Sequence, residues 1–191
     1  MKAEAEARST PEDRAAQAHH PGHPPGAGRN LLFLREEELR LAQDLLFFGY
    51  RDFTAGADAI LADLAMGRAH HRVLHFVGRR PGITVGDLLG ILGITKQSLG
   101  RVLTPLIEEG FVVQASGLTD RRQRLLSLAP KGVALERQLF ERQRDTVMRA
   151  YREAGPQAVE GFRRVMRGLM GAQAREALQR LEDPAGEAAN R

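Results

Sequence analysis

The stretch from Gly67 to Gly132 restricts the fold of this 191-residue chain more than any other part of it. Thr84 and Thr95 each stand immediately before a helical pattern of apolar residues, which is the position of a helix N-cap. Asp87 follows Thr84 by three residues, as the acidic partner in a capping box does. Gly93 lies between the two patterns and favours a tight turn. The stretch therefore predicts two helices joined by a turn, the helix-turn-helix arrangement.

The second of these helices has a regular apolar face and is followed by two short strands. Its inward positions are expected to be Leu99, Val102, Leu103, Leu106 and Ile107. Gly110 fits a left-handed C-cap, whereas Pro105 removes a backbone hydrogen bond and should bend the helix. Residues 111–113 and 125–128 are typical of strands, and the loop between them is too long for a two-residue turn. We expect a β-hairpin whose tip carries an Asp-Arg-Arg sequence.

Positive charge is concentrated in the same part of the chain. Residues 68–131 contain ten basic and four acidic side chains, a net charge of +6. The whole chain has a net charge of only +4, so the other residues are slightly acidic on balance. A localised cationic surface attracts phosphate groups. The helix-turn-helix and its basic hairpin together therefore indicate a nucleic-acid ligand.

An apolar stripe at helical spacing precedes this segment. Residues 31–66 predict one long helix, or two helices interrupted near Gly49 or Gly56. Residues 45–48 are four consecutive apolar side chains, a band too wide for one side of an isolated helix. Such a band indicates burial between partners, so we assign residues 31–66 to N-terminal dimerisation helices.

A second set of long helices follows the segment. One helix is expected to start at Pro130 and to be broken at Gly155-Pro156, and another to continue from there to about Leu181. These helices have no large core of their own to join, so their simplest use is to pack against a second copy of the chain. We assign residues 133–182 to C-terminal dimerisation helices and residues 67–132 to a separate domain between the two helical regions.

The two ends of the chain are expected to lack a fold. Residues 1–30 are rich in Ala, Glu, Pro, Gly and His and show no apolar period, so we predict a disordered tail. The histidines of residues 19–26 could hold a metal only loosely, and no metal site is predicted there. Residues 183–191 should fray.

Several classes of protein are excluded by what the sequence lacks. The chain has no cysteine, which removes disulfides, thiolate metal ligands and thiol-based redox sensing. No run approaches 18 apolar residues, and the N-terminus lacks the order of a secretory signal. The chain contains no Gly-rich phosphate loop, no Gly-x-Ser-x-Gly elbow and no His-Glu-x-x-His motif. We expect a cytoplasmic protein that is not an enzyme and needs no membrane, catalytic residues, metal or cofactor.

The chain resembles the MarR family of transcriptional regulators. The resemblance covers roughly residues 33–182 and rests on ITKQSLGRVLTPLIEEGFV, on DRRQRLLSLAPKG and on the flanking helices. Within the family it is most similar to the PetP-type subgroup. One departure is Ala129, because the family often has a helix-capping Thr at that position.

The resemblance carries expectations about fold and partners. It implies a mainly α fold with a small β-wing, that is, a winged helix-turn-helix flanked by long dimerisation helices. It also implies a homodimer that binds a pseudo-palindromic operator in double-stranded DNA. Many members of the family are released from DNA by small acidic or phenolic ligands, which implies an anionic or aromatic effector here.

Five residues lie where the recognition helix of the family meets the major groove: Thr95, Lys96, Gln97, Ser98 and Arg101. Gln97 and Arg101 suit base edges, because Gln can form two hydrogen bonds with adenine and Arg two with guanine. Thr95, Lys96 and Ser98 suit phosphates at a helix N-terminus. The alternative is that these residues form only the solvated face of a core helix.

The wing motif of the family falls on Asp120, Arg121 and Arg122. The resemblance implies that Arg122 enters the minor groove and that Asp120 orients the wing through a charged contact. Arg121 and Arg124 would reach phosphates. The alternative is a charged hairpin that only keeps the protein in solution.

A mixture of aromatic and cationic residues suggests a ligand cleft between the dimerisation helices and the winged domain. The candidates are Phe47, Tyr50, Arg68, His71, Arg72 and His75. An anionic aromatic effector would suit this mixture. The alternative is that the aromatic side chains simply belong to a dimer core.

Two further functions stay open beside a DNA-binding regulator. His71 and His75 are four residues apart and could both ligate zinc from one helix face, although the sequence offers no third ligand. This would make a metal-responsive regulator; the alternative is that both are ordinary hydrogen-bonded helix residues. The winged helix could also be a protein-interaction module that binds no DNA. The sequence does not distinguish a repressor from an activator.

Overall fold

The computed structural model describes residues 35–117 and 120–182. The tails expected at residues 1–30 and 183–191, including the histidines of residues 19–26, lie outside the described residues. In chain order the elements are α1 (Glu36–Ala62), α2 (Arg68–Arg79), β1 (Ile83–Thr84), α3 (Val85–Leu92), α4 (Lys96–Glu108), β2 (Val112–Ser116), β3 (Arg124–Leu128), α5 (Pro130–Leu169) and α6 (Ala172–Glu182). The described part comprises two units, residues 35–44 and residues 45–182.

The first unit contains only the beginning of α1. Glu36 and its two successors put three carboxylates in the first turn, where the positive end of the helix dipole stabilises them. The Glu38 carboxylate accepts the backbone N–H of Arg35 at 3.1 Å, which satisfies one donor ahead of the helix. The helix then runs without interruption through Gly49 and Gly56, so residues 36–62 form one long helix rather than two.

The two helix starts predicted in the helix-turn-helix are confirmed. Thr84 Oγ1 accepts the backbone N–H of Asp87 at 3.0 Å, and its hydroxyl donates to the Asp87 carboxylate at 2.7 Å. Thr95 Oγ1 accepts the backbone N–H of Ser98 at 3.2 Å. Gly93 ends α3 in the left-handed region, with φ of 63°, where a side chain would be strained. The hydrogen bonds of Thr84 and Thr95 thus fix where α3 and α4 begin, and Gly93 fixes where α3 ends.

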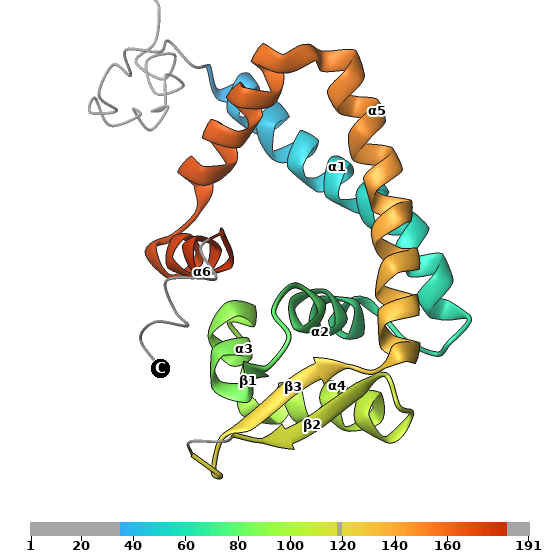
Figure 1. Ribbon diagram of the computed structural model, residues 1–191. Coiled ribbons are helices and arrows are strands. Elements are labelled where there is room, and N and C mark those ends of the chain that lie inside the picture. Colours follow the sequence, from blue (N-terminus) through green and yellow to red (C-terminus); the bar gives the residue numbers. More distant parts are fainter. Residues whose placement is uncertain (1–34, 118–119, 183–191) are drawn as a thin grey trace, which may run out of the picture. The chain divides into compact units, whose positions relative to one another are not determined.

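The hairpin of β2 and β3 is confirmed, and a third strand joins it. The strand order is β1-β3-β2, with all pairs antiparallel (Figure 1). In the hairpin, Val112 pairs with Leu128 and Ser116 with Arg124. Strand β1 was not expected, because its two residues are too few to show an alternating pattern. Its position is fixed by tertiary pairing of Ile83 with Leu126.

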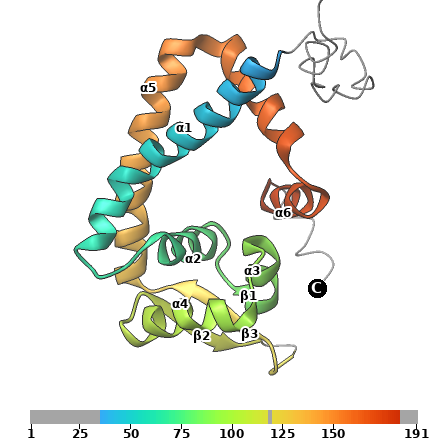
Figure 2. The same cartoon turned by 180° about the vertical axis from the view of Figure 1, so that it is seen from behind.

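The core of the second unit lies between these helices and the sheet. Every element from α1 to the first half of α5 contributes buried side chains to this core. Helix α4 packs against β2 (Figure 2). Glycine is required at position 132, because a Cβ there would lie 2.0 Å from the carbonyl oxygen of Phe111. The first turn of α5 can therefore approach the end of α4 only with glycine at this position. Ala129 precedes that turn without a side-chain cap, and Pro130 occupies the first turn.

The C-terminal helices differ in one respect from the expectation. The break at Gly155-Pro156 is confirmed, since Gly155 has φ of 78° inside α5. The single final helix expected up to Leu181 is wrong, because α5 ends at Leu169 and α6 begins only at Ala172. Met170 between them has extended backbone angles. None of the helices in the described ranges has the length and apolar character needed to cross a membrane.

Candidate nucleic-acid interface

Helix α4 separates its side chains into two faces. Leu99, Leu103 and Leu106 are buried in the core. The candidate contact residues Thr95, Lys96, Gln97, Ser98 and Arg101 are all exposed. Gln97 and Arg101 are four residues apart, so their side chains share one face of the helix. The apolar face holds α4 on the domain and leaves the polar face available to a partner.

Thr104 is a residue of this face that the sequence analysis missed. It is exposed, and it follows Gln97 by seven residues and Arg101 by three. This spacing puts it on the same stripe, since seven residues are close to two helical turns. The i+7 spacing was the signal that could have identified it. Glu108, four residues further on, ends the stripe with a negative charge.

The N-terminus of α4 has unpaired backbone donors and suitable side chains beside them. The Thr95 hydroxyl donates to Ser98 Oγ at 3.0 Å, so the Ser98 hydroxyl hydrogen can point to solvent. The first N–H groups of any α-helix have no partner within the helix, apart from those that a cap satisfies. Together with Lys96 they form an arrangement that suits a phosphate group.

The hairpin tip is organised by Asp120. Its Oδ1 accepts the backbone N–H of Arg122 at 2.9 Å, and its carbonyl oxygen accepts the N–H of Gln123 at 3.0 Å. Gly117 donates in turn to the carbonyl of Gln123, and a Cβ on Gly117 would lie 2.7 Å from the Asp120 carbonyl oxygen. The charged contact expected of Asp120 takes the form of a carboxylate that accepts the backbone N–H of Arg122.

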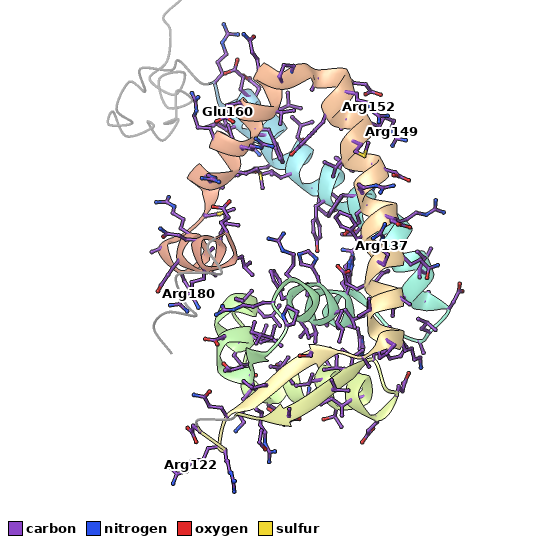
Figure 3. All side chains as sticks on the ribbon, in the orientation of Figure 1. Arg122, Arg137, Arg149, Arg152, Glu160 and Arg180 are labelled. Atoms are coloured by element: carbon purple, nitrogen blue, oxygen red, sulfur yellow. The ribbon has the colours of Figure 1, made fainter. Side chains whose placement is uncertain are left out.

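The wing presents three arginines to solvent. Arg121, Arg122 and Arg124 are exposed, and Figure 3 shows Arg122 at the hairpin tip, pointing away from the sheet. Within residues 35–117 and 120–182, no carboxylate pairs with any of the three. Their guanidinium groups are therefore available to an anionic partner.

Two other cations of the basic segment are used inside the protein. Lys131 Nζ donates to the carbonyl oxygen of Glu109 at 3.0 Å and lies 3.9 Å from the centre of the Phe111 ring. Arg68 forms an ion pair of 2.8 Å with Asp58. Of the other cations in the segment, Lys96, Arg101, Arg121, Arg122 and Arg124 lie on α4 and the wing, whereas Arg72, Arg79 and Arg80 lie in or directly after α2.

The candidate ligand residues are only partly brought together. The guanidinium of Arg68 lies 5.4 Å from the Tyr50 ring centre. The hydrogen bond with Asp58 raises the pKa of Arg68, while burial lowers the pKa of His71, with Asp58 opposing that effect. Sequence reasoning missed Asp58, whose Oδ1 is buried without a hydrogen-bond partner.

The remaining candidates are Phe47, Arg72 and His75, of which His75 neighbours His71 on α2. Phe47 contacts Phe48 edge to face, with ring centres 5.2 Å apart, and is 63% exposed. Arg72 is exposed. His75 faces Glu136 of α5, with Nδ1 and Oε1 3.8 Å apart.

The histidines have ordinary structural surroundings. Burial lowers the pKa of His75, and the neighbouring Arg79 and His71 add to the effect. Burial also raises the pKa of Glu136. His70 accepts the backbone N–H of Gly67 through Nδ1 at 3.1 Å. In the part of the chain that the structure describes, no three His, Cys, Asp or Glu side chains are grouped to hold a metal ion, and His71 and His75 gain no third ligand.

Apolar side chains are exposed along α1 and α5. Among the described residues, all but two of the large apolar side chains exposed to solvent belong to these helices: Leu39, Leu41, Leu45, Leu46, Phe47, Phe48 and Tyr50 of α1, and Val133, Phe140, Met148, Phe162, Val165 and Leu169 of α5. Leu45 and Phe47 are 64% and 63% exposed. Exposed apolar surface on this scale is typical of an interaction surface.

Comparison with known proteins gives a consistent result. Residues 66–123 match the MarR family. The HTH-type transcriptional regulator PetP of Rhodobacter capsulatus is 51% identical over 156 residues, which cover 82% of this chain and 94% of PetP.

Solved structures show the same fold. A MarR-family regulator from Silicibacter pomeroyi has a TM-score of 0.59 at 21% identity, over 74% of this chain and 94% of its own. A mutant of E. coli MarR, solved in complex with operator DNA, has a TM-score of 0.57 at 19% identity, over 71% and 97% of the respective chains. The expected mainly α fold with a small β-wing is thereby confirmed.

Proposed function

This chain belongs to the MarR family of transcriptional regulators, and from that premise we propose that it binds specific sites in double-stranded DNA as a homodimer. The family and its PetP relative are regulators of transcription and not enzymes. The observation that carries the proposal is that the cationic and amide side chains of α4 and the wing are exposed to solvent. Within the described residues the arginines of the wing are exposed and have no carboxylate partner, which suits a polyanion such as DNA.

The recognition helix α4 enters the major groove in this proposal. Gln97 and Arg101 contact base edges from the middle of the exposed face, where Gln suits adenine and Arg suits guanine. Thr95, Lys96 and Ser98 hold a phosphate at the helix N-terminus. The phosphate contacts fix the register of the helix, and the base contacts select the sequence.

The wing adds a second contact with the same duplex. Arg122 inserts into the minor groove, where a narrow groove concentrates negative potential. Arg121 and Arg124 bind the flanking phosphates. The hydrogen bond from Arg122 N–H to Asp120 supports this role, because it positions the backbone of Arg122.

The homodimer is supported by the exposed apolar side chains of α1 and α5. Burial of such side chains against a second copy stabilises association by about 25 cal/mol for each Å² of apolar surface. A two-fold dimer would present two copies of α4 about 34 Å apart, one turn of duplex. The matching site in DNA is then pseudo-palindromic. E. coli MarR, which shares the fold, was solved in complex with operator DNA.

A small-molecule effector is a further part of the proposal. Tyr50, Arg68 and His71 provide an aromatic ring, a cation and a half-buried imidazole. Arg68 is already paired with Asp58, so an anionic effector must compete with this carboxylate or use the exposed Arg72. Benzoate, the simplest aromatic anion, serves as the probe. The chain has two tyrosines and no tryptophan, so tyrosine emission reports its binding. No change in tyrosine emission or DNA affinity on addition of benzoate would remove an aromatic anion as the effector.

The proposal is tested by selecting duplexes from a random-sequence pool and titrating the enriched duplex at several salt concentrations. We expect a pseudo-palindromic sequence to be enriched. The logarithm of its affinity should fall linearly with the logarithm of salt concentration, with a slope of about −0.9 for each phosphate neutralised. Failure to enrich any sequence, or affinity that does not change with salt, would instead favour a protein-interaction module.

A further inference from the structure

Gly100 occupies the middle of α4 without a reason inside the protein. Glycine is the least favourable residue for a helix interior apart from proline, because it loses the most backbone freedom. The φ of Gly100 is not positive, so its backbone needs no glycine. A Cβ built there meets no other atom within 4 Å, so no close packing requires glycine either. Gly132 is the contrasting case, since a Cβ on that residue would overlap the carbonyl of Phe111.

The neighbours of Gly100 on the helix surface are the residues assigned to DNA. Lys96 and Gln97 lie four and three residues before it, and Thr104 lies four residues after it. All three are exposed, as is the adjacent Arg101. Gly100 is itself half-buried and therefore forms a gap in the side-chain surface beside the exposed stripe of Gln97, Arg101 and Thr104.

Two other helical glycines that face open space lie on surfaces that we also assign to partners. Gly49 of α1 lies four residues after Leu45, and Gly161 of α5 lies four residues before Val165, so each shares a helix face with an exposed apolar side chain. Those positions belong to the proposed subunit interface. Glycine on a partner-facing helix surface lets the backbone approach the partner closely.

We infer that Gly100 is a specificity-determining position, at which the backbone of α4 makes its closest approach to the base pairs of the major groove. The inference rests on the proposed DNA-binding function. Without a Cβ at this position, the helix can seat deeply enough for Gln97 and Arg101 to reach the base edges. A side chain at position 100 would hold the helix away from the bases while leaving the phosphate contacts at its N-terminus within reach.

The test uses Gly100→Ala and Gly100→Leu in the full chain. Both residues favour the helix, so the melting temperature should rise, by roughly 2–4 °C for Gly100→Ala. Affinity for the duplex selected by the unmodified chain should fall about tenfold for Gly100→Ala, and further for Gly100→Leu. Affinity for a scrambled duplex of equal length should change less, because phosphate contacts dominate nonspecific binding.

Gly90→Ala is the matched control. Gly90 is also helical, faces open space and belongs to the same helix-turn-helix, but its carbonyl oxygen accepts a hydrogen bond from Gln173 of α6 at 3.2 Å. Its substitution should raise the melting temperature to a similar degree and leave the affinity for the selected duplex unchanged.

The outcomes separate this inference from the proposed function. A stabilised Gly100→Ala variant with an unchanged ratio of specific to nonspecific affinity would overturn the inference. A variant with a lowered melting temperature would overturn it too, because Gly100 would then serve the fold. If the unmodified chain selects no duplex, the proposed function itself fails. If the unmodified chain binds its selected duplex and the Gly100 variants bind that duplex with the same affinity, the inference fails while the proposed function stands.

Discussion

Single residues in this protein are positioned by hydrogen bonds of two ranges. Thr84 and Thr95 accept N–H groups three residues ahead, and such local bonds could be predicted from residue type and spacing. Lys131 instead donates to a carbonyl 22 residues away. Asp58 pairs with Arg68 across the turn between two helices. Contacts of this second kind depend on the packing of elements, which the sequence pattern does not contain.

Arg122→Ala tests the wing at the scale of one residue. The variant should lose about 1–3 kcal/mol of binding free energy for the selected duplex, because one guanidinium leaves the minor groove. The hydrogen bond of its backbone N–H to Asp120 does not depend on the side chain, so the tip should keep its conformation. The measurement is a band-shift titration at fixed salt concentration.

Arg149→Ala is the charge-matched control for this prediction. Arg149 is exposed on α5, and Figure 3 shows it outside the wing. Loss of the same charge there should change affinity by much less. Equal losses for both variants would mean that net charge, rather than a wing contact, governs binding.

At the scale of elements, periodic segments could be predicted and short or interrupted ones could not. The apolar face of α4 was predicted because its period of 3.6 residues extends over several turns. Strand β1 has only two residues, and the gap between α5 and α6 contains no proline. Gly171 was the one local signal of the gap between α5 and α6, whereas β1 has no local signal and arises from tertiary pairing with β3.

The pairing of α2 with α5 predicts a dependence of stability on pH. Burial holds the pKa values of His71 and His75 below their ordinary value of 6.5. The unfolded chain therefore takes up protons first as pH falls through 6.5, and stability present above that pH is lost below it. Glu136, with a raised pKa, opposes this loss as pH falls further toward its ordinary value of 4.5.

The expected result is a melting temperature that falls as the pH is lowered from about 7 to about 5.5. His71 lies near Asp58, and His75 is surrounded by Glu136, Arg79 and Phe76, so both imidazoles contribute. The double substitution His71→Gln and His75→Gln should flatten this part of the curve in thermal unfolding experiments. A curve of unchanged slope would show that other groups titrate.

At the scale of the whole molecule, the apolar side chains of α1 and α5 that are exposed among the described residues are the ones that the proposed homodimer would need to cover. The sequence indicated this need, since residues 45–48 are apolar on more sides than a lone helix can bury. It could not specify which side chains stay exposed in a single chain, because that depends on how α1 and α5 pack against their neighbours. The exposure of Leu45 now gives a position for a test.

Leu45→Glu should separate the subunits while leaving each of them folded. The residue is 64% exposed in the single chain, so the substitution costs little inside one subunit but places a charge in an apolar interface. Sedimentation velocity should show a shift from dimer to monomer, with affinity for the selected duplex reduced more than tenfold. Val113→Glu, in β2 and 50% exposed, is the control and should stay dimeric.

The mass of the complex formed with one selected duplex tests the paired-subunit account most directly. Light scattering coupled to size-exclusion chromatography should give the duplex plus two chains of 21.1 kDa each, at protein concentrations where the free chain is also a dimer. A complex that contains a single chain, or a free protein that remains monomeric while it binds DNA at full affinity, would contradict the account.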